Sequence, residues 1–294
     1  MNGERLFHLD RAAVKRSFGR ASRSYDAAAG LQRAIQQELL ERLQFFSIEP
    51  ATILDLGAGT GATSVELRHR YRRADIIALD IAHEMLRAAG RRQWPWRRFS
   101  RLCADANALP LADHSIDLAI SNLMLQWCDR PALVFAELQR VLKPGGLVLF
   151  STFGPTTLQE LREAWLRADP HVHVSDFPDM PALSAAMQHG GLSEPVLDVE
   201  HRVIHYRDAE ALLHELRALG ARNAHAERAR GLTGRGRFEA MRQGYERGRV
   251  AAGLPATYEV IYGAAFASDR HAMQQIAGET VIPLQALTTR RFNP

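Results

Sequence analysis

Three glycines alternate with other residues in the stretch ILDLGAGTG (residues 53–61), directly after an apolar run that ends in an acid. Glycine adopts backbone angles that other residues avoid, so Gly57, Gly59 and Gly61 let a tight turn bring its N–H groups close to a ligand. In a dinucleotide-binding turn these groups meet a pyrophosphate. Asp55 suits a pyrophosphate badly, but it attracts a cation. The turn therefore indicates a ligand with a positive charge.

Two further acids end the next two predicted strands. Asp80 lies 19 residues beyond Gly61, where a carboxylate is placed to bind ribose hydroxyls. Asp105 follows, placed to accept a hydrogen bond from an adenine amino group. One glycine alone can serve a turn, and one aspartate alone can cap a helix. The whole series predicts an adenosine ligand with a cationic amino-acid part, such as S-adenosylmethionine.

Alternating strands and helices must position these residues. Strands that are nearly all apolar alternate with helices five times over about a hundred residues, which is typical of a parallel sheet covered on both faces. Residues 10–46 read as helical, with Leu31, Ile35, Leu39 and Leu43 on one face. Helices that we interpret as a lid are expected at about 155–190 and 208–252. Strands are expected at 51–57, 75–81, 101–106, 116–123, 147–153, 194–206 and 256–267.

Four stretches across residues 50–153 resemble the class I S-adenosylmethionine-dependent methyltransferases: ILDLGAGTG, ALDIAHEML, DANALPLADHSIDLAISN and LQRVLKPGG. The resemblance implies an α/β, Rossmann-like fold whose seven-stranded sheet is mostly parallel, with helices on both faces and an antiparallel last strand. The expected organisation is an N-terminal helical segment (1–48), a methyltransferase domain (49–268) that carries the two helical insertions, and a C-terminal tail (269–294) of unknown role.

The residues set several methyl acceptors aside. After the fourth strand the chain reads SNLMLQWC, without the Asp/Asn-Pro-Pro-aromatic motif of enzymes that methylate DNA bases. No metal site is expected, because His171 and His173 read as part of a solvated loop and a metal needs three or four convergent ligands. No general base is obvious. A carboxylate acceptor needs none, since it is already ionised at neutral pH and requires only alignment and a dry pocket.

Other stretches resemble a narrower family, the malonyl-acyl-carrier-protein O-methyltransferases of biotin synthesis (the BioC family). They are FGRASRSYDAAAGLQR, SNLMLQWC, TLQELREAW, LRALGARNA, LTGRGRFEAM and ATYEVIYGAAF. They span most of the chain, from Phe18 to about Ala267, with no recognised counterpart for residues 269–294. The resemblance implies methylation of the free carboxylate of a malonyl thioester. Two alternatives stay open: a methyltransferase for a quinone or a dicarboxylate, and a cofactor-binding assembly factor or hydroxylase for a respiratory complex.

The expected cofactor site lies where the strands end. We expect Asp80 at the ribose and Asp105 at the adenine, with Asp55 and the glycines at the methionine end. Asn122 and Leu123 should line the methyl-transfer cleft. Apolar side chains should wall the adenine, although helix packing explains them equally well. The full predicted set is Tyr25, Arg33, Asp55, Gly57, Gly59, Gly61, Asp80, Ile81, Met85, Asp105, Ala106, Asn122 and Leu123.

The family resemblance also implies a catalytic group of Tyr25, Arg217 and Arg162. The N-terminal segment would close over the cofactor, with Tyr25 near the reacting methyl group and Arg33 available to a carboxylate. Arg217 in LRALG is the first candidate to meet the malonyl carboxylate, and Arg162 in ELREAW is the second. For both, the alternative is a solvated arginine on a helix face.

The charge balance bears on partners. The net charge is +4, and residues 217–249 hold nine arginines against three glutamates. This segment suits an acidic acyl carrier protein that carries a malonyl group, with malonyl coenzyme A as the other candidate substrate, and a solvated lid explains it equally well. Since nearly every basic residue is arginine, the balance does not indicate nucleic acid.

The expected cellular location of the protein depends on membrane-spanning and targeting segments. The sequence has no apolar run of membrane-spanning length and no secretory signal, so we expect no membrane insertion. An arginine-rich start leaves a mitochondrial presequence open, although Glu4, Asp10 and Asp26 argue against it. Cys103 and Cys128 are read as buried or half-buried thiols in a reducing compartment. A cytoplasmic protein is therefore expected, of undefined oligomeric state.

Overall fold

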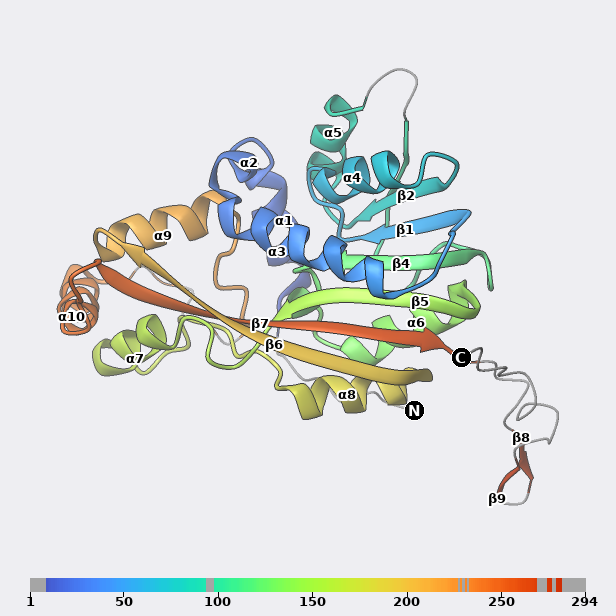
Figure 1. Ribbon diagram of the computed structural model, residues 1–294. Helices are drawn as coiled ribbons and strands as arrows, with labels where there is room; N and C mark the ends of the chain where they lie inside the picture. Colours follow the sequence, from blue (N-terminus) through green and yellow to red (C-terminus); the bar gives the residue numbers. More distant parts are fainter. Residues whose placement is uncertain are drawn as a thin grey trace.

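The computed structural model describes residues 9–93, 98–226, 228, 231, 233–268, 274–276 and 279–281. In this part of the chain seven strands form one sheet in the order β3-β2-β1-β4-β5-β7-β6 (Figure 1). Strands β1 to β5 run parallel, and β7 runs antiparallel to both of its neighbours, β5 and β6. The predicted seven-stranded, mostly parallel sheet is thus confirmed. The strands are β1 (Thr52–Leu56), β2 (Asp75–Asp80), β3 (Ser100–Cys103), β4 (Ile116–Asn122), β5 (Leu142–Phe153), β6 (Leu192–Tyr206) and β7 (Leu254–Ala267).

Helices cover both faces of the sheet because successive strand residues point to opposite sides. Ile53 belongs to the core under α3 and α4, whereas Leu54 belongs to the core under α6 and α8. The helices are α1 (Arg11–Ala21), α2 (Tyr25–Ala28), α3 (Gly30–Arg42), α4 (Ala62–Arg70), α5 (His83–Arg91), α6 (Pro131–Val141), α7 (Gln159–Ala168), α8 (Met180–His189), α9 (Ala209–Ala218) and α10 (Arg235–Glu246), with 3-10 turns η1 (Leu43–Phe45) and η2 (Leu125–Trp127).

The N-terminal segment is not one helix but three. Asp10 caps α1 by accepting a 2.9 Å hydrogen bond from the Ala13 N–H, and the helix ends before Ser22. Ala29 separates α2 from α3 with a backbone that is not helical. The apolar face predicted at Leu31, Ile35, Leu39 and Leu43 is confirmed, since all four side chains are buried in the core under α3.

The two helical insertions are also interrupted. Between α7 and α8 the chain carries Pro170 and Pro178, and proline removes the N–H that a continuous helix needs. Between α9 and α10 the chain turns at Gly220, whose φ of 76° favours glycine. Each predicted helical range therefore holds two separate helices, α7 and α8 in the first and α9 and α10 in the second.

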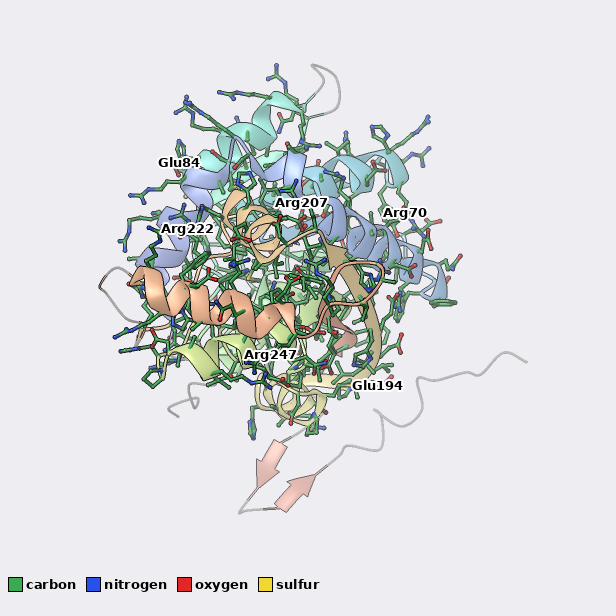
Figure 2. All side chains as sticks on the ribbon, turned by 90° about the vertical axis from the view of Figure 1, so that its left-hand side faces the viewer. Arg70, Glu84, Glu194, Arg207, Arg222 and Arg247 are labelled. Atoms are coloured by element: carbon green, nitrogen blue, oxygen red, sulfur yellow. The ribbon has the colours of Figure 1, made fainter. Side chains whose placement is uncertain are left out.

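Strands β6 and β7 reach past the rest of the sheet on the side turned to the viewer in Figure 2, where α10 lies across the front, with α9 above and α7 below. No helix in the described ranges is both long and apolar enough to cross a membrane. Of the expected tail, only β8 (Gln274–Ile276) and β9 (Glu279–Val281) are described, as an antiparallel pair. The rest of that segment lies outside the described residues.

Candidate active site

The glycine turn joins β1 to α4 at the carboxyl end of the sheet. The N–H groups of Gly57 and Ala58 both donate to the Leu79 carbonyl, at 2.8 and 2.9 Å, which fixes the turn to β2. Gly57 has a φ of 78°, and a Cβ on it would collide with the side chain of Met124. A glycine is therefore required there by both the backbone angle and the space.

Asp80 stands beside this turn. Its Oδ2 accepts a 2.9 Å hydrogen bond from the Gly59 N–H, and its Oδ1 accepts a 2.8 Å bond from the Ala82 N–H. Burial raises the pKa of this carboxyl above its ordinary value, and the backbone N–H groups oppose the rise. Each oxygen keeps a further acceptor position, so Asp80 can bind the two hydroxyls of a ribose.

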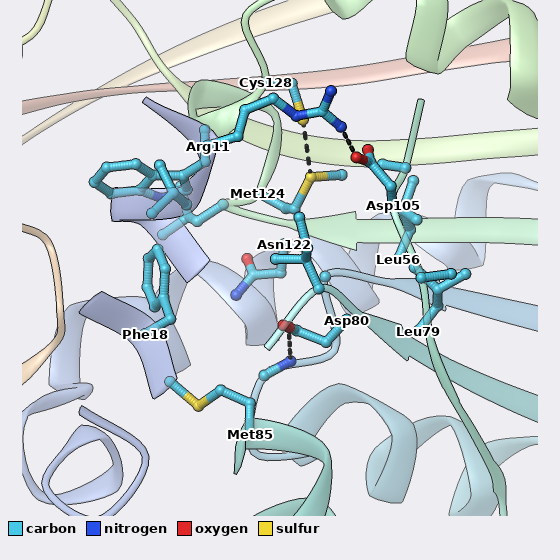
Figure 3. A pocket seen from close by; sticks show the side chains of 18 of the residues that line it. Arg11, Phe18, Leu56, Leu79, Asp80, Met85, Asp105, Asn122, Met124 and Cys128 are labelled. Carbon is cyan, nitrogen blue, oxygen red and sulfur yellow. Dashed lines mark hydrogen bonds and ion pairs between the residues drawn. The ribbon is translucent and has the colours of Figure 1, made fainter. Parts of the chain in front are cut away.

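A cavity of about 90 Å³ lies over these strand ends (Figure 3). An adjoining cavity of about 40 Å³ shares Tyr25, Gly57, Gly59 and Asn122 with it and adds Arg33. The two cavities bring together eleven residues of the predicted cofactor set. These are Tyr25, Arg33, Gly57, Gly59, Asp80, Ile81, Met85, Asp105, Ala106, Asn122 and Leu123.

Two predicted residues, Asp55 and Gly61, do not line either cavity. The Asp55 carboxylate is buried and accepts a 2.5 Å hydrogen bond from the Ser64 hydroxyl of α4. Gly61 allows α4 to begin close to α5, because a Cβ there would come within 2.8 Å of the Ala89 Cβ. Their part in holding the methionine end stays a prediction, and in this structure both residues act on the packing of α4.

Asp55 makes the stability of the protein depend on pH. Burial first, opposed by Ser64 and then reinforced by the charge of Asp80, raises the pKa of Asp55 to about 7. The folded chain therefore holds this proton more tightly than the unfolded chain, whose pKa is near 3.8, and the resulting stabilisation is lost as pH rises towards 7. Between about pH 5 and pH 8, wild type should lose about 2 kcal/mol of unfolding free energy relative to Asp55→Asn.

Urea denaturation of both proteins at the two pH values measures this difference. Asp117→Asn is the control: at Asp117 burial is outweighed by hydrogen bonds from Lys143 and the Thr52 N–H, so its pKa is lowered. Since both of its pKa values then lie below this pH range, the control should show no such change. Parallel stability curves for wild type and Asp55→Asn would contradict the raised pKa.

Helix α1 forms one wall of the cofactor cavity, through Arg11, Val14 and Phe18. Arg11 forms an ion pair with Asp105, and Phe18 points into the same space (Figure 3). Sequence reasoning assigned Asp105 but missed Arg11, since only the fold brings α1 over β3. It also missed Asn107, whose Oδ1 is buried without a hydrogen-bond partner in the described chain. Such an orphaned acceptor suits the amino group of a ligand.

Strand β4 ends in a constrained turn at this cavity. Asn122 accepts a 2.8 Å hydrogen bond from the Ser151 hydroxyl and donates a 3.2 Å bond to the Gln32 carbonyl of α3. Leu123 has a φ of 52°, which is uncommon for a branched residue, and non-glycine residues in this region are often found at functional sites. The turn therefore links β4, β5 and α3 at the point where the cavities meet.

Tyr25 lies at the junction of the two small cavities. Burial, followed by the charges of Asp80 and Asp26, raises its pKa well above the ordinary value for tyrosine. Its hydroxyl therefore stays protonated at physiological pH and can donate a hydrogen bond. This position agrees with the expected place near the reacting group, and the catalytic role stays a prediction.

A larger cavity of about 340 Å³ adjoins these two under α7 and α9. It shares Trp127 with the first cavity and Gln32 with the second, and the Gln32 Oε1 is buried without a partner in the described chain. Its walls are largely apolar, with Phe153, Leu161 and Trp165 among them. An acceptor bound there would reach the cofactor cavity past Trp127 and Gln32.

The two candidate arginines differ in their surroundings. Arg217 lines the larger cavity, is exposed at its mouth and has no side-chain partner in the described chain. Arg162 donates to the carbonyls of Pro155, Thr157 and Ser175, at 2.9 to 3.3 Å, while its Nε is buried without a partner in the described chain. Arg162 therefore holds the loop around the cavity, and Arg217 is available to a ligand.

Both predicted loop histidines lie between α7 and α8, where His171 is exposed as expected, but His173 lines the larger cavity and is largely buried, contrary to expectation. His173 stacks on Trp165 with ring centroids 3.7 Å apart, and its Nε2 lies 3.4 Å from the buried carboxylate of Asp169. His171 contacts the same carboxylate, and burial lowers the pKa of His173. In the described ranges no three or more His, Cys, Asp or Glu side chains are placed to hold a metal. Cys128 is buried at the cofactor cavity, whereas Cys103 is exposed, contrary to expectation.

The cofactor cavity fits the predicted ligand on its own chemistry. Asp80 offers two acceptor oxygens, the Asn107 Oδ1 offers an unpartnered acceptor at the other end beside the Arg11–Asp105 ion pair, and Leu79 and Met85 give apolar walls between them. The acidic groups also favour a cation over a pyrophosphate. An adenosine ligand that carries a positive charge matches this set of side chains.

Comparison with known proteins agrees with this chemistry. Residues 54–150 match the family described as "Methyltransferase domain". A solved structure from Thermotoga maritima, described as a SAM-dependent methyltransferase and possible histamine N-methyltransferase, superposes with a TM-score of 0.53 at 17% identity, over 87% of this chain and all of that one. At this identity the match supports the fold alone.

Two relatives are much more similar, and both are named malonyl-acyl-carrier-protein O-methyltransferase. The protein from Methylovorus sp. (strain MP688) is 47% identical over 88% of this chain and 89% of its own length. The protein from Xylella fastidiosa (strain M23) is 43% identical over 100% of this chain and 99% of its own, so residues 269–294, which had no recognised counterpart, are included in that alignment. The chain therefore belongs to the malonyl-acyl-carrier-protein O-methyltransferases, a family of class I enzymes that use S-adenosylmethionine.

Proposed function

We propose that this enzyme transfers a methyl group from S-adenosylmethionine to the free carboxylate of a malonyl group carried by an acyl carrier protein. The observation that carries the proposal is the 47% identity, over most of both chains, to a relative with that name. The larger cavity next to the cofactor cavity supports it, since a thioester substrate needs a largely apolar path that ends at the donor. The methyl ester would hide the charge from fatty-acid elongation enzymes and so start pimelate assembly for biotin.

The residues of this chain would act by binding, orienting and excluding water. S-adenosylmethionine supplies an electrophilic methyl group on a positively charged sulfur. Asp80, Asp105 and the glycine turn would hold the cofactor, while Phe18 and Trp127 would keep water out between α1 and η2. Attack by a carboxylate on a sulfonium neutralises both charges, so a dry pocket favours the reaction.

No proton has to be removed from the acceptor, because a carboxylate is ionised at neutral pH. Tyr25, whose phenol stays protonated, would donate a hydrogen bond near the reacting groups. Arg217 would attract the acceptor into the larger cavity, and its exposed position avoids a tight bidentate grip that would reduce nucleophilicity. Alignment and desolvation would then supply most of the rate enhancement.

We assign the enzyme to the cytoplasm, where carrier-bound acyl chains are made. We also favour the carrier protein over coenzyme A as the bearer of the malonyl group, on the names of the relatives.

Transfer of labelled methyl from S-adenosylmethionine to malonyl-acyl carrier protein tests the proposal. Label should appear on the malonyl species and be released by mild base as methanol, as expected for an ester. Acetyl-acyl carrier protein, which lacks the free carboxylate, should stay unlabelled. Cofactor binding without transfer to either species would refute this function and favour the assembly-factor alternative.

A further inference from the structure

Two arginine-bearing turns touch at the mouth of the larger cavity. One is formed by the end of α1 and the residues after it and carries Arg20 and Arg23, and the other is formed by the end of α9 and the residues after it and carries Arg217 and Arg222. The two turns are in direct contact: the Ser24 hydroxyl donates a 2.8 Å hydrogen bond to the Ala218 carbonyl. We call Arg20, Arg23, Arg217 and Arg222 the mouth cluster.

The tight packing of the two turns keeps the mouth cluster together. A Cβ on Gly220 would lie 3.0 Å from the Ala21 Cβ and from the Ser17 carbonyl oxygen, so the turn after α9 is pressed against the last turn of α1. Arg217 and Arg222 themselves line the larger cavity. Arg222 is exposed beside the N-terminal helices, as Figure 2 shows. Four cations thus stand on one rim of the entrance.

The mouth cluster is not neutralised. All four side chains are exposed, and none of them has an ion-pair or hydrogen-bond partner within the described ranges. Three arginines in or just after α10 are different. Arg237 pairs with Asp169 at 3.1 Å, Arg242 pairs with Glu239 at 2.7 Å, and Arg249 pairs with Glu246. Arg235 and Arg247, at the two ends of α10, are exposed without such a partner in the described chain, so α10 offers two available cations against the four of the mouth cluster.

We propose that the mouth cluster is the docking surface for the acidic acyl carrier protein, and that α10 is not. This inference rests on the proposed function. A carrier protein must stand at the entrance through which its tethered malonyl group reaches the cofactor, and exposed, unpaired cations there attract an acidic partner during encounter. Because the cluster spans α1 and α9, docking would also hold α1, which lines the cofactor cavity, against the turn that follows α9.

The variant Arg20→Glu/Arg23→Glu tests the docking surface without changing any residue that lines one of the three cavities. We expect kcat/KM for malonyl-acyl carrier protein to fall about tenfold at low ionic strength, through KM more than kcat. The loss should shrink in salt, which screens the attraction in wild type. The matched control is Arg72→Glu/Arg73→Glu, with the same change in charge on two exposed arginines just before β2, at the opposite end of the parallel strands from the cofactor cavity. It should change kcat/KM less than twofold.

Two further measurements separate docking from other defects. Turnover of malonyl-pantetheine, a small thioester without phosphate groups, and affinity for S-adenosylmethionine should be equal in the two double variants. Fluorescence anisotropy of labelled carrier protein should show about tenfold weaker binding to Arg20→Glu/Arg23→Glu. Equal binding by the two double variants would overturn the docking surface. If wild type binds carrier protein at these arginines but transfers no methyl group, the proposed function fails while the docking surface stands.

Discussion

Asp80→Asn is expected to weaken the binding of S-adenosylmethionine by about a hundredfold and to abolish turnover at ordinary cofactor concentrations. Loss of two charge-assisted hydrogen bonds to ribose hydroxyls, each of about 1.5–3 kcal/mol, accounts for this size. The Asn side chain also presents an NH₂ group to one of the two backbone N–H groups that Asp80 now binds, Gly59 or Ala82. The glycine turn would then lose one of its supports. Isothermal titration calorimetry with the cofactor measures the effect.

Asp75→Asn is the matched control for this prediction. Asp75 begins the strand that Asp80 ends, is exposed, and its side chain makes no hydrogen bond or ion pair in the described chain. The control should keep the affinity of wild type. If Asp80→Asn binds S-adenosylmethionine within about threefold of wild type, then Asp80 does not bind the ribose, since even one lost charge-assisted bond exceeds that change.

The glycine turn and the strand ends could be predicted because they depend on local sequence and on a general property of parallel sheets. Carboxyl ends of neighbouring strands meet at one edge, so acids that follow β2 and β3 must lie near the turn after β1. The structure places Asp80 and Asp105 in one cavity with Gly57 and Gly59, as this rule requires.

The alternation of side chains along β1 accounts for the contact that Asp55 makes. Strand residues alternate between faces, and Leu54 and Leu56 belong to the core under α6. Asp55 must then face the other side, where α4 begins with Thr63 and Ser64. The period of the strand thus accounts for the hydrogen bond between Asp55 and Ser64 of α4, while a part for Asp55 at the methionine end stays a prediction.

The parts that could not be predicted depend on contacts between distant segments. The ion pair of Arg11 with Asp105 requires α1 to cross above β3, and no local pattern in either segment encodes that crossing. The same holds for the contact between Ala21 and Gly220, which joins two turns about two hundred residues apart. The arginines of residues 217–249 were interpreted as one basic surface, because composition does not show which of them form ion pairs with a neighbouring glutamate.

Arg217→Ala is expected to lower kcat/KM for malonyl-acyl carrier protein by about fiftyfold and to leave cofactor affinity unchanged. A hydrogen bond between charged groups contributes about 1.5–3 kcal/mol, and Arg217 is the candidate that lines the larger cavity with its guanidinium unused. Its neighbour Arg222 supplies the matched control, because Arg222→Ala removes the same charge from the same rim. Arg222→Ala should cost only the severalfold loss expected from weaker docking.

Arg162→Ala should behave differently from both, because Arg162 already donates to the carbonyls of Pro155, Thr157 and Ser175. Its removal leaves partly buried carbonyls without donors, which should lower the unfolding free energy by about 1–3 kcal/mol. Thermal denaturation and steady-state kinetics on the three variants therefore separate the roles. A stable Arg162→Ala protein with a fiftyfold defect in kcat/KM, together with an active Arg217→Ala protein, would move the substrate carboxylate from the mouth of the cavity to the loop between β5 and α7. The carboxylate would then approach the cofactor along Thr157 and Leu158 instead of past Arg217, and the malonyl arm would have to enter from the α7 side.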